Sequence, residues 1–150
     1  MQVSVRSNAR PGGLIDTSAL VAIVDAGDPW HERCRAAYAS SKLPLIATDA
    51  VLTEAFHFAL RRGKSLRQPT WNFIRLGAIQ LAPIMHADLP VLEQLMHRYA
   101  DRPMDFADAT LVHVAQREGL NTILTVDHDD FETYRIGRNA KFRILPARAR

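Results

Sequence analysis

Cysteine is almost absent from the sequence, since Cys34 is the only one among 150 residues. A single cysteine excludes an internal disulfide framework and a zinc site built on cysteines. No apolar run approaches the roughly 18 residues of a membrane span, and the opening residues lack the apolar centre of a signal peptide. We therefore expect a cytoplasmic protein without a membrane segment.

Other absences narrow the function. Neither a P-loop nor a Gly-x-Gly-x-x-Gly motif is present, which argues against a nucleotide-binding regulator. The six histidines are scattered, without His-x-His or His-Glu-x-x-His spacing, so a zinc enzyme is not expected. Phosphatases of the haloacid-dehalogenase type need Asp-x-Asp after the first strand, and Ser18 stands where the second acid would be.

The order of apolar and polar segments predicts one α/β domain. Short apolar runs predict strands at residues 14–16, 45–47, 79–82, 122–125 and 142–145. Capped or amphipathic segments predict helices near residues 18–25, 30–40, 49–62, 66–76, 89–99 and 104–118. This alternation indicates a three-layer α/β/α sandwich around a parallel sheet of about five strands. We assign the domain to residues 14–150 and a polar arm to residues 1–13.

The net charge of +3 conceals an uneven distribution of charged residues. Eight of the 16 acids lie within residues 101–132, whereas residues 134–150 contain six basic residues and no acid. A second basic cluster comprises Arg61, Arg62, Lys64 and Arg67. Each cluster alone is typical of a solvated face. An acidic centre with basic flanks also suits a site that holds a cation and grips a polyanion.

Two aspartates follow predicted strands. Asp16 comes directly after Leu14 and Ile15, and Asp127 follows the run from Thr122 to Val126. The carboxyl ends of parallel strands form the usual ligand crevice of an open α/β sheet. A turn or helix N-cap is the common alternative for either residue alone.

Asp108 lies on a helix face that should be buried, because Leu111, Val112 and Ala115 follow it at helical spacing. Asp105 is suited to be the N-cap of the same helix, with Asp108 at the third position. A capping role explains well why an acid stands at position 105. It explains less well why Asp108 has apolar neighbours on its helix face.

Glu54 falls at the rim of the apolar face of the predicted helix 49–62, which indicates a half-buried side chain. A surface ion pair with Arg61 is the alternative. The Glu-x-x-His spacing from Glu54 to His57 also occurs in di-iron bundles, but those need the motif twice and a four-helix fold.

If Asp16, Glu54, Asp108 and Asp127 converge, repulsion and desolvation make an empty site unfavourable. A divalent cation relieves both effects, and an all-oxygen set of ligands favours Mg²⁺ or Mn²⁺ over zinc. Such ions are commonly completed by phosphate oxygens of the substrate. The chemistry indicated is hydrolysis of a phosphate ester.

The same residues resemble the signature of PIN-domain nucleases, and most of all the VapC-type toxins of bacterial toxin–antitoxin pairs. The segments that carry the likeness run from Leu14 to Leu20, from Asp108 to Val112 and from Thr125 to Phe131, with Glu54 between the first two. The acids are separated by 38, 54 and 19 positions, and the likeness extends from Leu14 to Leu145.

The resemblance implies a PIN-like fold and a Mg²⁺- or Mn²⁺-dependent endoribonuclease. It places Asp16, Glu54, Asp108 and Asp127 in the catalytic and metal-binding quartet. It also gives supporting roles to Thr17 and Thr125, and to Asp105 or Asp130. A cognate antitoxin protein and a homodimer are the partners that the likeness implies, and the arm has no counterpart in the family pattern.

For RNA, we expect the basic cluster Arg61, Arg62, Lys64 and Arg67, together with the C-terminal basic residues, to contact backbone phosphates. Trp30, Trp71 and Phe73 are candidates for base stacking, with core packing as the alternative. Two other functions stay open, namely a PIN-like domain that binds RNA or protein without cleavage, and a Mg²⁺-dependent phosphohydrolase acting on another substrate.

Overall fold

A parallel five-stranded sheet with the order β3-β2-β1-β4-β5 forms the centre of the molecule. The computed structural model describes residues 9–102 and 104–149. The strands are β1 (Gly13–Ile15), β2 (Leu45–Thr48), β3 (Ile79–Ala82), β4 (Thr122–Leu124) and β5 (Arg143–Leu145). The strands β1, β2 and β4 are almost wholly buried, as expected for a parallel sheet that helices cover on both faces.

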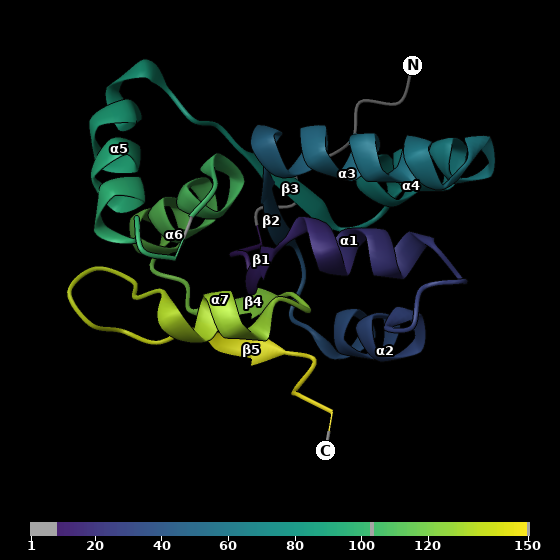
Figure 1. Ribbon diagram of the computed structural model, residues 1–150. Helices are drawn as coiled ribbons and strands as arrows, with labels where there is room; N and C mark the ends of the chain where they lie inside the picture. The colour runs from purple at the N-terminus through teal and green to yellow at the C-terminus, as the bar shows by residue number, and fades with distance from the viewer. Residues whose placement is uncertain (1–8, 103, 150) are drawn as a thin grey trace.

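Helices cover the sheet from both sides, with α5 and α6 on one side and α1, α2 and α4 on the other (Figure 1). The helices are α1 (Thr17–Val24), α2 (His31–Ser40), α3 (Asp49–Arg62), α4 (Arg67–Leu76), α5 (Leu89–Arg98), α6 (Phe106–Glu118) and α7 (His128–Thr133). Two short 3₁₀ turns, η1 (Lys64–Leu66) and η2 (His86–Asp88), precede α4 and α5. The predicted three-layer α/β/α architecture is confirmed.

Local signals explain where several helices begin and end. The Thr48 hydroxyl accepts from the backbone N–H of Val51 and caps α3. Gly119, in the left-handed conformation with φ 66°, ends α6. These boundaries lie within two residues of the predicted ones.

The helix α7 was not predicted. Its six residues include three acids and make less than two turns, so they show no apolar periodicity. Phe131 is fully buried and packs edge-on against Tyr134 and Phe142, at centroid distances of 5.3 and 5.4 Å. Tertiary packing, rather than local pattern, therefore accounts for this helix.

The topology determines where a ligand can bind. The chain leaves β1 towards β2, which is the neighbour of β1 on one side. The neighbour of β1 on the other side is β4. The carboxyl ends of β1 and β4 thus flank the point at which the strand order reverses, the preferred ligand crevice of such sheets.

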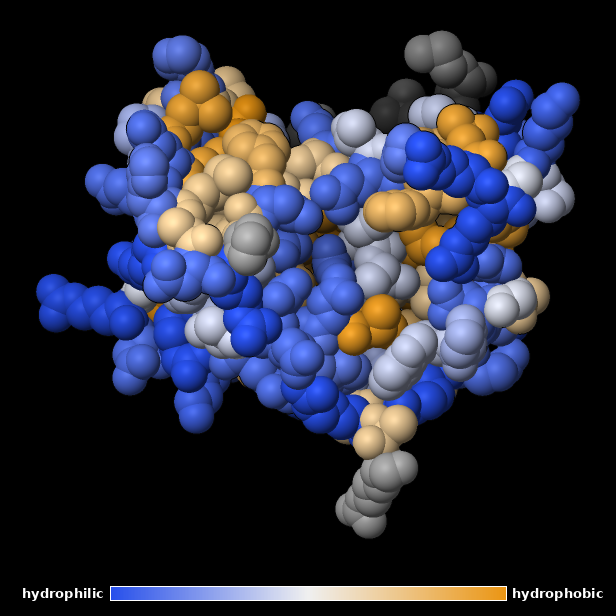
Figure 2. Space-filling view, viewed as in Figure 1, coloured by the Kyte–Doolittle hydropathy of each residue, from blue (hydrophilic) through white to orange (hydrophobic). Residues whose placement is uncertain are grey.

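The surface is mainly hydrophilic over the centre and lower part of the face in view (Figure 2). Hydrophobic residues gather at the upper left, over η2 and the start of α5, where Met85 and Leu89 are exposed. In the part of the chain that the structure describes, no helix has the length and apolar character needed to span a membrane. The predicted arm falls mostly outside the described residues.

Candidate active site

Asp16 is a buried carboxylate at the carboxyl end of β1, and three hydrogen bonds hold it in place. It follows β1, caps α1 and is 3% exposed. One carboxylate oxygen accepts from the backbone N–H of Thr17 at 2.7 Å. The other accepts from the hydroxyls of Thr125 at 2.8 Å and Ser18 at 3.1 Å. Asp16 is therefore both the N-cap of α1 and a buried carboxylate at the end of β1, so the two interpretations of this residue hold together.

Hydroxyl groups connect this carboxylate to Asp127, beyond the end of β4. The backbone N–H of Asp127 donates to the Thr125 hydroxyl at 3.0 Å. The N–H of Val126 donates to the Ser18 hydroxyl at 3.1 Å. Thr125 therefore contacts both aspartates. The contacts of Ser18 with Asp16 and Val126 were not predicted. The signal that could have indicated them is the position of Ser18, two residues after an acid at the end of a strand.

Glu54 enters the same region from α3. Its carboxylate accepts from the Thr17 hydroxyl at 3.1 Å and is half-buried, as predicted from its place on the helix. Within the described residues no ion pair joins Glu54 to Arg61, so the alternative of a surface pair is not observed. Thr17 thus links the start of α1 to α3.

Asp105 and Asp108 enter from the first turn of α6. Asp105 is exposed and caps the helix by accepting from the backbone N–H of Asp108 at 2.8 Å. Asp108 is 9% exposed, and its carboxylate accepts from the Tyr134 hydroxyl at 2.8 Å. Tyr134 is fully buried. Sequence reasoning missed Tyr134, which lies 26 residues from its partner and outside every motif.

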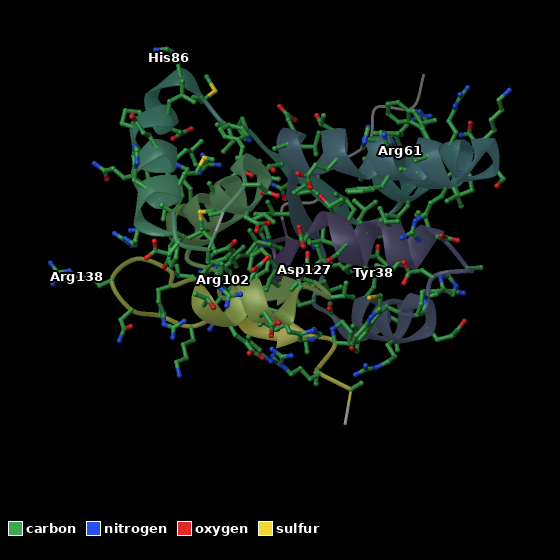
Figure 3. The ribbon with its side chains drawn as sticks, viewed as in Figure 1. Tyr38, Arg61, His86, Arg102, Asp127 and Arg138 are labelled. Atoms are coloured by element: carbon green, nitrogen blue, oxygen red, sulfur yellow. The ribbon has the colours of Figure 1, made fainter. Side chains whose placement is uncertain are left out.

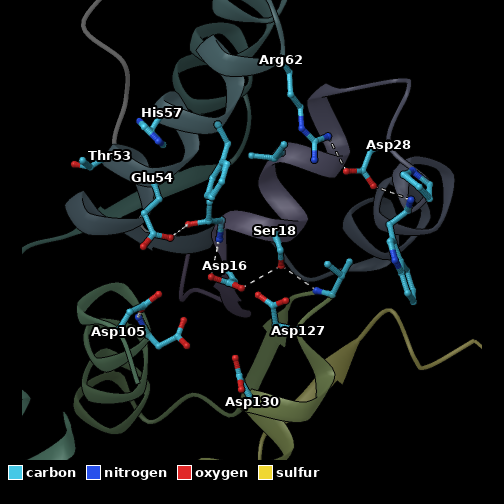
Figure 4. Close-up of a pocket in the computed structure, with 17 residues that line it drawn as sticks. Asp16, Ser18, Asp28, Thr53, Glu54, His57, Arg62, Asp105, Asp127 and Asp130 are labelled. Atoms are coloured by element: carbon cyan, nitrogen blue, oxygen red, sulfur yellow. Dashed lines mark hydrogen bonds and ion pairs between the residues drawn. The ribbon is translucent and has the colours of Figure 1, made fainter. Parts of the chain in front are cut away.

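These carboxylates face one open cleft with a volume of about 770 Å³. Figure 4 shows Asp16, Asp105 and Asp127 directed towards a common space, with Glu54 above it and Asp130 below. Seven of the eight predicted acids and hydroxyl residues line the cleft, namely Asp16, Thr17, Glu54, Asp105, Asp108, Asp127 and Asp130. The eighth, Thr125, is buried beneath it in contact with Asp16.

Burial and crowding make the ionised carboxylates unfavourable. Burial, with the charge of Asp127, raises the pKa of Asp16 to about 7. Burial, with the charges of Asp16 and Asp105, raises the pKa of Asp108 to about 8. The pKa values of Glu54 and Asp127 are also raised, mainly by burial and then by neighbouring carboxylates. Such perturbed groups in a cleft are typical of functional sites.

The donor chemistry indicates which cation the cleft would suit. Within residues 9–102 and 104–149, no group of three or more His, Cys, Asp or Glu side chains is arranged to hold a metal ion by itself. Mg²⁺ does not need such a cage, because it commonly binds through one or two carboxylates and keeps several waters. The open cleft, its oxygen donors and the repulsion between them fit an ion of that kind.

Comparison with known proteins identifies the family of the chain. The family model described as "PIN domain" matches residues 13–137. Ribonuclease VapC26 of Mycobacterium tuberculosis (strain ATCC 25618 / H37Rv) is 31% identical over 134 residues, which cover 89% of this chain and 99% of the relative. The chain belongs to the PIN-domain family, as a VapC-type member. The predicted class, an RNA-cleaving enzyme of the VapC toxin family, is thereby confirmed.

Two solved structures share the PIN fold of this VapC-type protein. The crystal structure of M. tuberculosis VapC20, a sarcin-ricin loop cleaving toxin, has a TM-score of 0.71 and 24% identity, covering 78% of this chain and 91% of that one. VapBC2 of Rickettsia felis, bound to a DNA fragment from its promoter, has a TM-score of 0.60 and 12% identity, covering 88% and 97%. Both likenesses concern the fold.

The predicted RNA-binding cations of the VapC-type domain differ in their contacts. Arg62 lines the cleft and donates to Asp25 at 2.7 Å and to Asp28 at 2.9 Å. Arg61, Lys64 and Arg67 are exposed near the end of α3 and the start of α4, and Figure 3 labels Arg61 there. Among the C-terminal basic residues, Arg148 is paired with Asp129 and Glu132.

The three candidate stacking residues pack against other rings. Trp30 lies near His128 at a centroid distance of 5.5 Å, Trp71 near Phe56 at 4.6 Å and Phe73 near Tyr38 at 5.1 Å. Of these, Trp30 lines the cleft. Core packing, which was the alternative to stacking, describes Phe73, whereas Trp71 keeps 45% of its surface exposed.

Proposed function

We propose that the acidic cleft is the active centre of this endoribonuclease and that it uses Mg²⁺ or Mn²⁺. The observation that carries the proposal is the convergence of four carboxylates from separate elements at the carboxyl edge of β1 and β4. Asp16, Glu54, Asp108 and Asp127 all line one cleft, and burial raises the pKa of each. A divalent cation lowers the free energy of such a group of ionised carboxylates.

One or two of these four carboxylates would hold the cation directly, and the others would reach it through bound water. When bound, a divalent cation supplies Lewis-acid polarisation of the scissile phosphate and activation of the attacking water. The surrounding hydroxyls keep the carboxylates in place. Thr125 and Ser18 hold one oxygen of Asp16, and Thr17 holds Glu54. Their part is to keep the ligands oriented while the substrate enters and leaves.

Membership of the VapC-type family supports a toxin role, an antitoxin partner and a homodimer. We propose that a cognate antitoxin silences the enzyme and that the enzyme acts as a homodimer. Size-exclusion chromatography with light scattering on the purified protein, alone and co-expressed with a candidate antitoxin, tests both assemblies. A monomer at all concentrations contradicts the homodimer, and an unchanged mass and activity after co-expression contradicts the antitoxin.

RNA cleavage tests the proposed active centre. Purified protein freed of any antitoxin is incubated with mixed cellular RNA in the presence of Mg²⁺, Mn²⁺ or EDTA, beside Asp16→Asn and Asp127→Asn variants. Asp49→Asn is the matched control, because Asp49 is an exposed aspartate of α3 outside the lining of the cleft.

We expect cleavage by the wild type and the control with either ion, none in EDTA, and a loss on the order of 100-fold or more in both cleft variants. Full activity in EDTA, or in both cleft variants, contradicts the proposed centre. RNA retention without cleavage in every sample favours the non-catalytic alternative.

A further inference from the structure

A second hollow adjoins the active-site cleft beside α7. It has a volume of about 410 Å³ and shares Trp30, Val126, Asp127 and Asp130 with the larger cleft. The two hollows therefore adjoin at these four residues, and we refer to the pair as the groove. The side that belongs to the smaller hollow alone is lined by Arg102, His128, Asp129 and Arg148, and we refer to it as the α7 limb.

Arg102 places a guanidinium in this limb, and one of its N–H groups donates to a carboxylate, that of Asp130. It belongs to the turn between α5 and α6, and its side chain reaches Asp130 of α7 at 3.3 Å. That side chain is 45% exposed, and Figure 3 shows it on the same face of the molecule as Asp127. A guanidinium has five N–H donors, and one of them accounts for this contact. Among residues 9–102 and 104–149, Asp130 is the only hydrogen-bond or ion-pair partner of this guanidinium, so its other donors are available for an anion in the groove.

The other two arginines of the groove are held more firmly. Arg148 uses its Nε and one terminal nitrogen for Glu132, and the same terminal nitrogen for Asp129. Arg62, at the opposite end, donates to two aspartates at 2.7 and 2.9 Å. Of the arginines that line the two hollows, Arg102 thus has the longest contact to a carboxylate and the most donors to offer.

The limb is better suited to backbone than to base recognition. At its border with the larger hollow lies Trp30, whose ring centroid is 4.5 Å from the Arg33 guanidinium and 5.5 Å from the His128 ring. The Arg33 guanidinium already lies over one face of this ring, which leaves less of the ring for a base to stack on. A guanidinium with free donors binds a phosphate directly, and such contacts position a nucleic acid without reading its sequence.

We propose that the α7 limb binds the RNA strand on one side of the scissile phosphate and that Arg102 holds a backbone phosphate there. The inference rests on the proposed function, because it assumes that the cut is made over the carboxylates of the larger hollow. It makes Arg102 a substrate-positioning residue. The enzyme should therefore depend on Arg102 for substrates long enough to occupy both hollows.

The test compares Arg102→Gln and Arg102→Lys with the matched control Arg98→Gln. Arg98 is an exposed arginine of the last turn of α5 that lines neither part of the groove. Binding of a labelled single-stranded RNA of about 12 nucleotides is measured by fluorescence anisotropy over a range of salt concentrations, with all proteins in an Asp16→Asn background that prevents cleavage. Steady-state cleavage of the same RNA and of a trinucleotide is measured in the active background.

We expect Arg102→Gln to lower the slope of log affinity against log salt by about 0.7, the value for one phosphate contact on a single strand. KM for the long RNA should rise about fivefold, the net effect of losing one hydrogen bond, whereas kcat and cleavage of the trinucleotide stay unchanged. Arg102→Lys should keep the slope, and Arg98→Gln should change nothing. The combination of salt slope with a KM-specific effect separates substrate contact from a loss of folding, which would lower kcat for both RNAs.

An equal change of slope in Arg98→Gln, or a fall in kcat that the trinucleotide shares, overturns the assignment of Arg102. The failure of the proposed function would look different. In that case no protein cleaves RNA with either ion, while the anisotropy measurement still reports whether Arg102 contributes a phosphate contact.

Discussion

Asp108→Asn should stabilise the metal-free protein, and the gain should grow with pH. The substitution removes a buried charge from α6 and keeps the shape of the side chain. Its amide oxygen can still accept from the Tyr134 hydroxyl, which donates to the carboxylate at 2.8 Å. The change therefore tests the electrostatics of the cleft with little change in packing.

The magnitude follows from the pKa of Asp108, which burial and the neighbouring carboxylates raise from 3.8 to about 8. Between pH 5 and pH 7 the unfolded chain has mostly lost this proton, whereas the folded protein keeps it. Because the folded state binds more protons, its stability falls as pH rises, by about 1.4 kcal/mol per pH unit for one group. The variant lacks this dependence, so the difference between the two proteins should change by roughly 3 kcal/mol across that range.

Urea unfolding in EDTA at several pH values, followed by circular dichroism, measures the difference. We expect the variant to be close to the wild type in stability near pH 4 and clearly more stable at pH 7. Asp49→Asn, on the exposed surface of α3, controls for a general effect of removing an acid. A stability difference that is the same at every pH refutes the claim that Asp108 is protonated in the folded, metal-free protein.

Three further substitutions test the hydroxyl partners of Asp108 and Glu54 and the close packing at Gly77. Tyr134→Phe removes the hydroxyl that holds Asp108. It should lower kcat for RNA cleavage by about 10- to 100-fold, while the melting temperature, measured by calorimetry, changes by only a few degrees. Thr17→Val removes the hydroxyl partner of Glu54. Metal-activated cleavage, measured as a Mn²⁺ titration, should need more Mn²⁺ in this variant and should recover in Thr17→Ser. Gly77→Ala would place a methyl group 2.2 Å from a backbone oxygen of α4. It should destabilise the fold by about 1–3 kcal/mol in urea unfolding.

The sheet and most helices could be predicted because their signals are local. Short apolar runs become strands of a sheet that is covered on both faces, and residues such as Thr48 and Gly119 mark helix ends by their own chemistry. The helix α7 has no such signal. Its stability depends on Phe131, whose partners lie outside the helix.

The acids of the site were predictable for a topological reason. Strand ends of a parallel sheet meet at one edge, so Asp16 and Asp127 could be placed together from the strand pattern alone. The partners of these acids depend on contacts between distant segments. Tyr134 reaches Asp108 across 26 positions, and Arg62 reaches Asp25 across 37. No periodicity or spacing in the sequence encodes those pairs.

Binding of Mn²⁺ to the metal-free protein measures whether the carboxylates of the cleft hold a divalent cation. The electron paramagnetic resonance signal of free Mn²⁺ is titrated with wild-type protein, Asp16→Asn, Asp127→Asn and the surface control Asp49→Asn, without any RNA. We expect that the wild type and the control bind Mn²⁺ and that both cleft variants bind it at least about tenfold more weakly. Equal binding by all four proteins, or no binding by any, contradicts the claim that the cleft holds the cation.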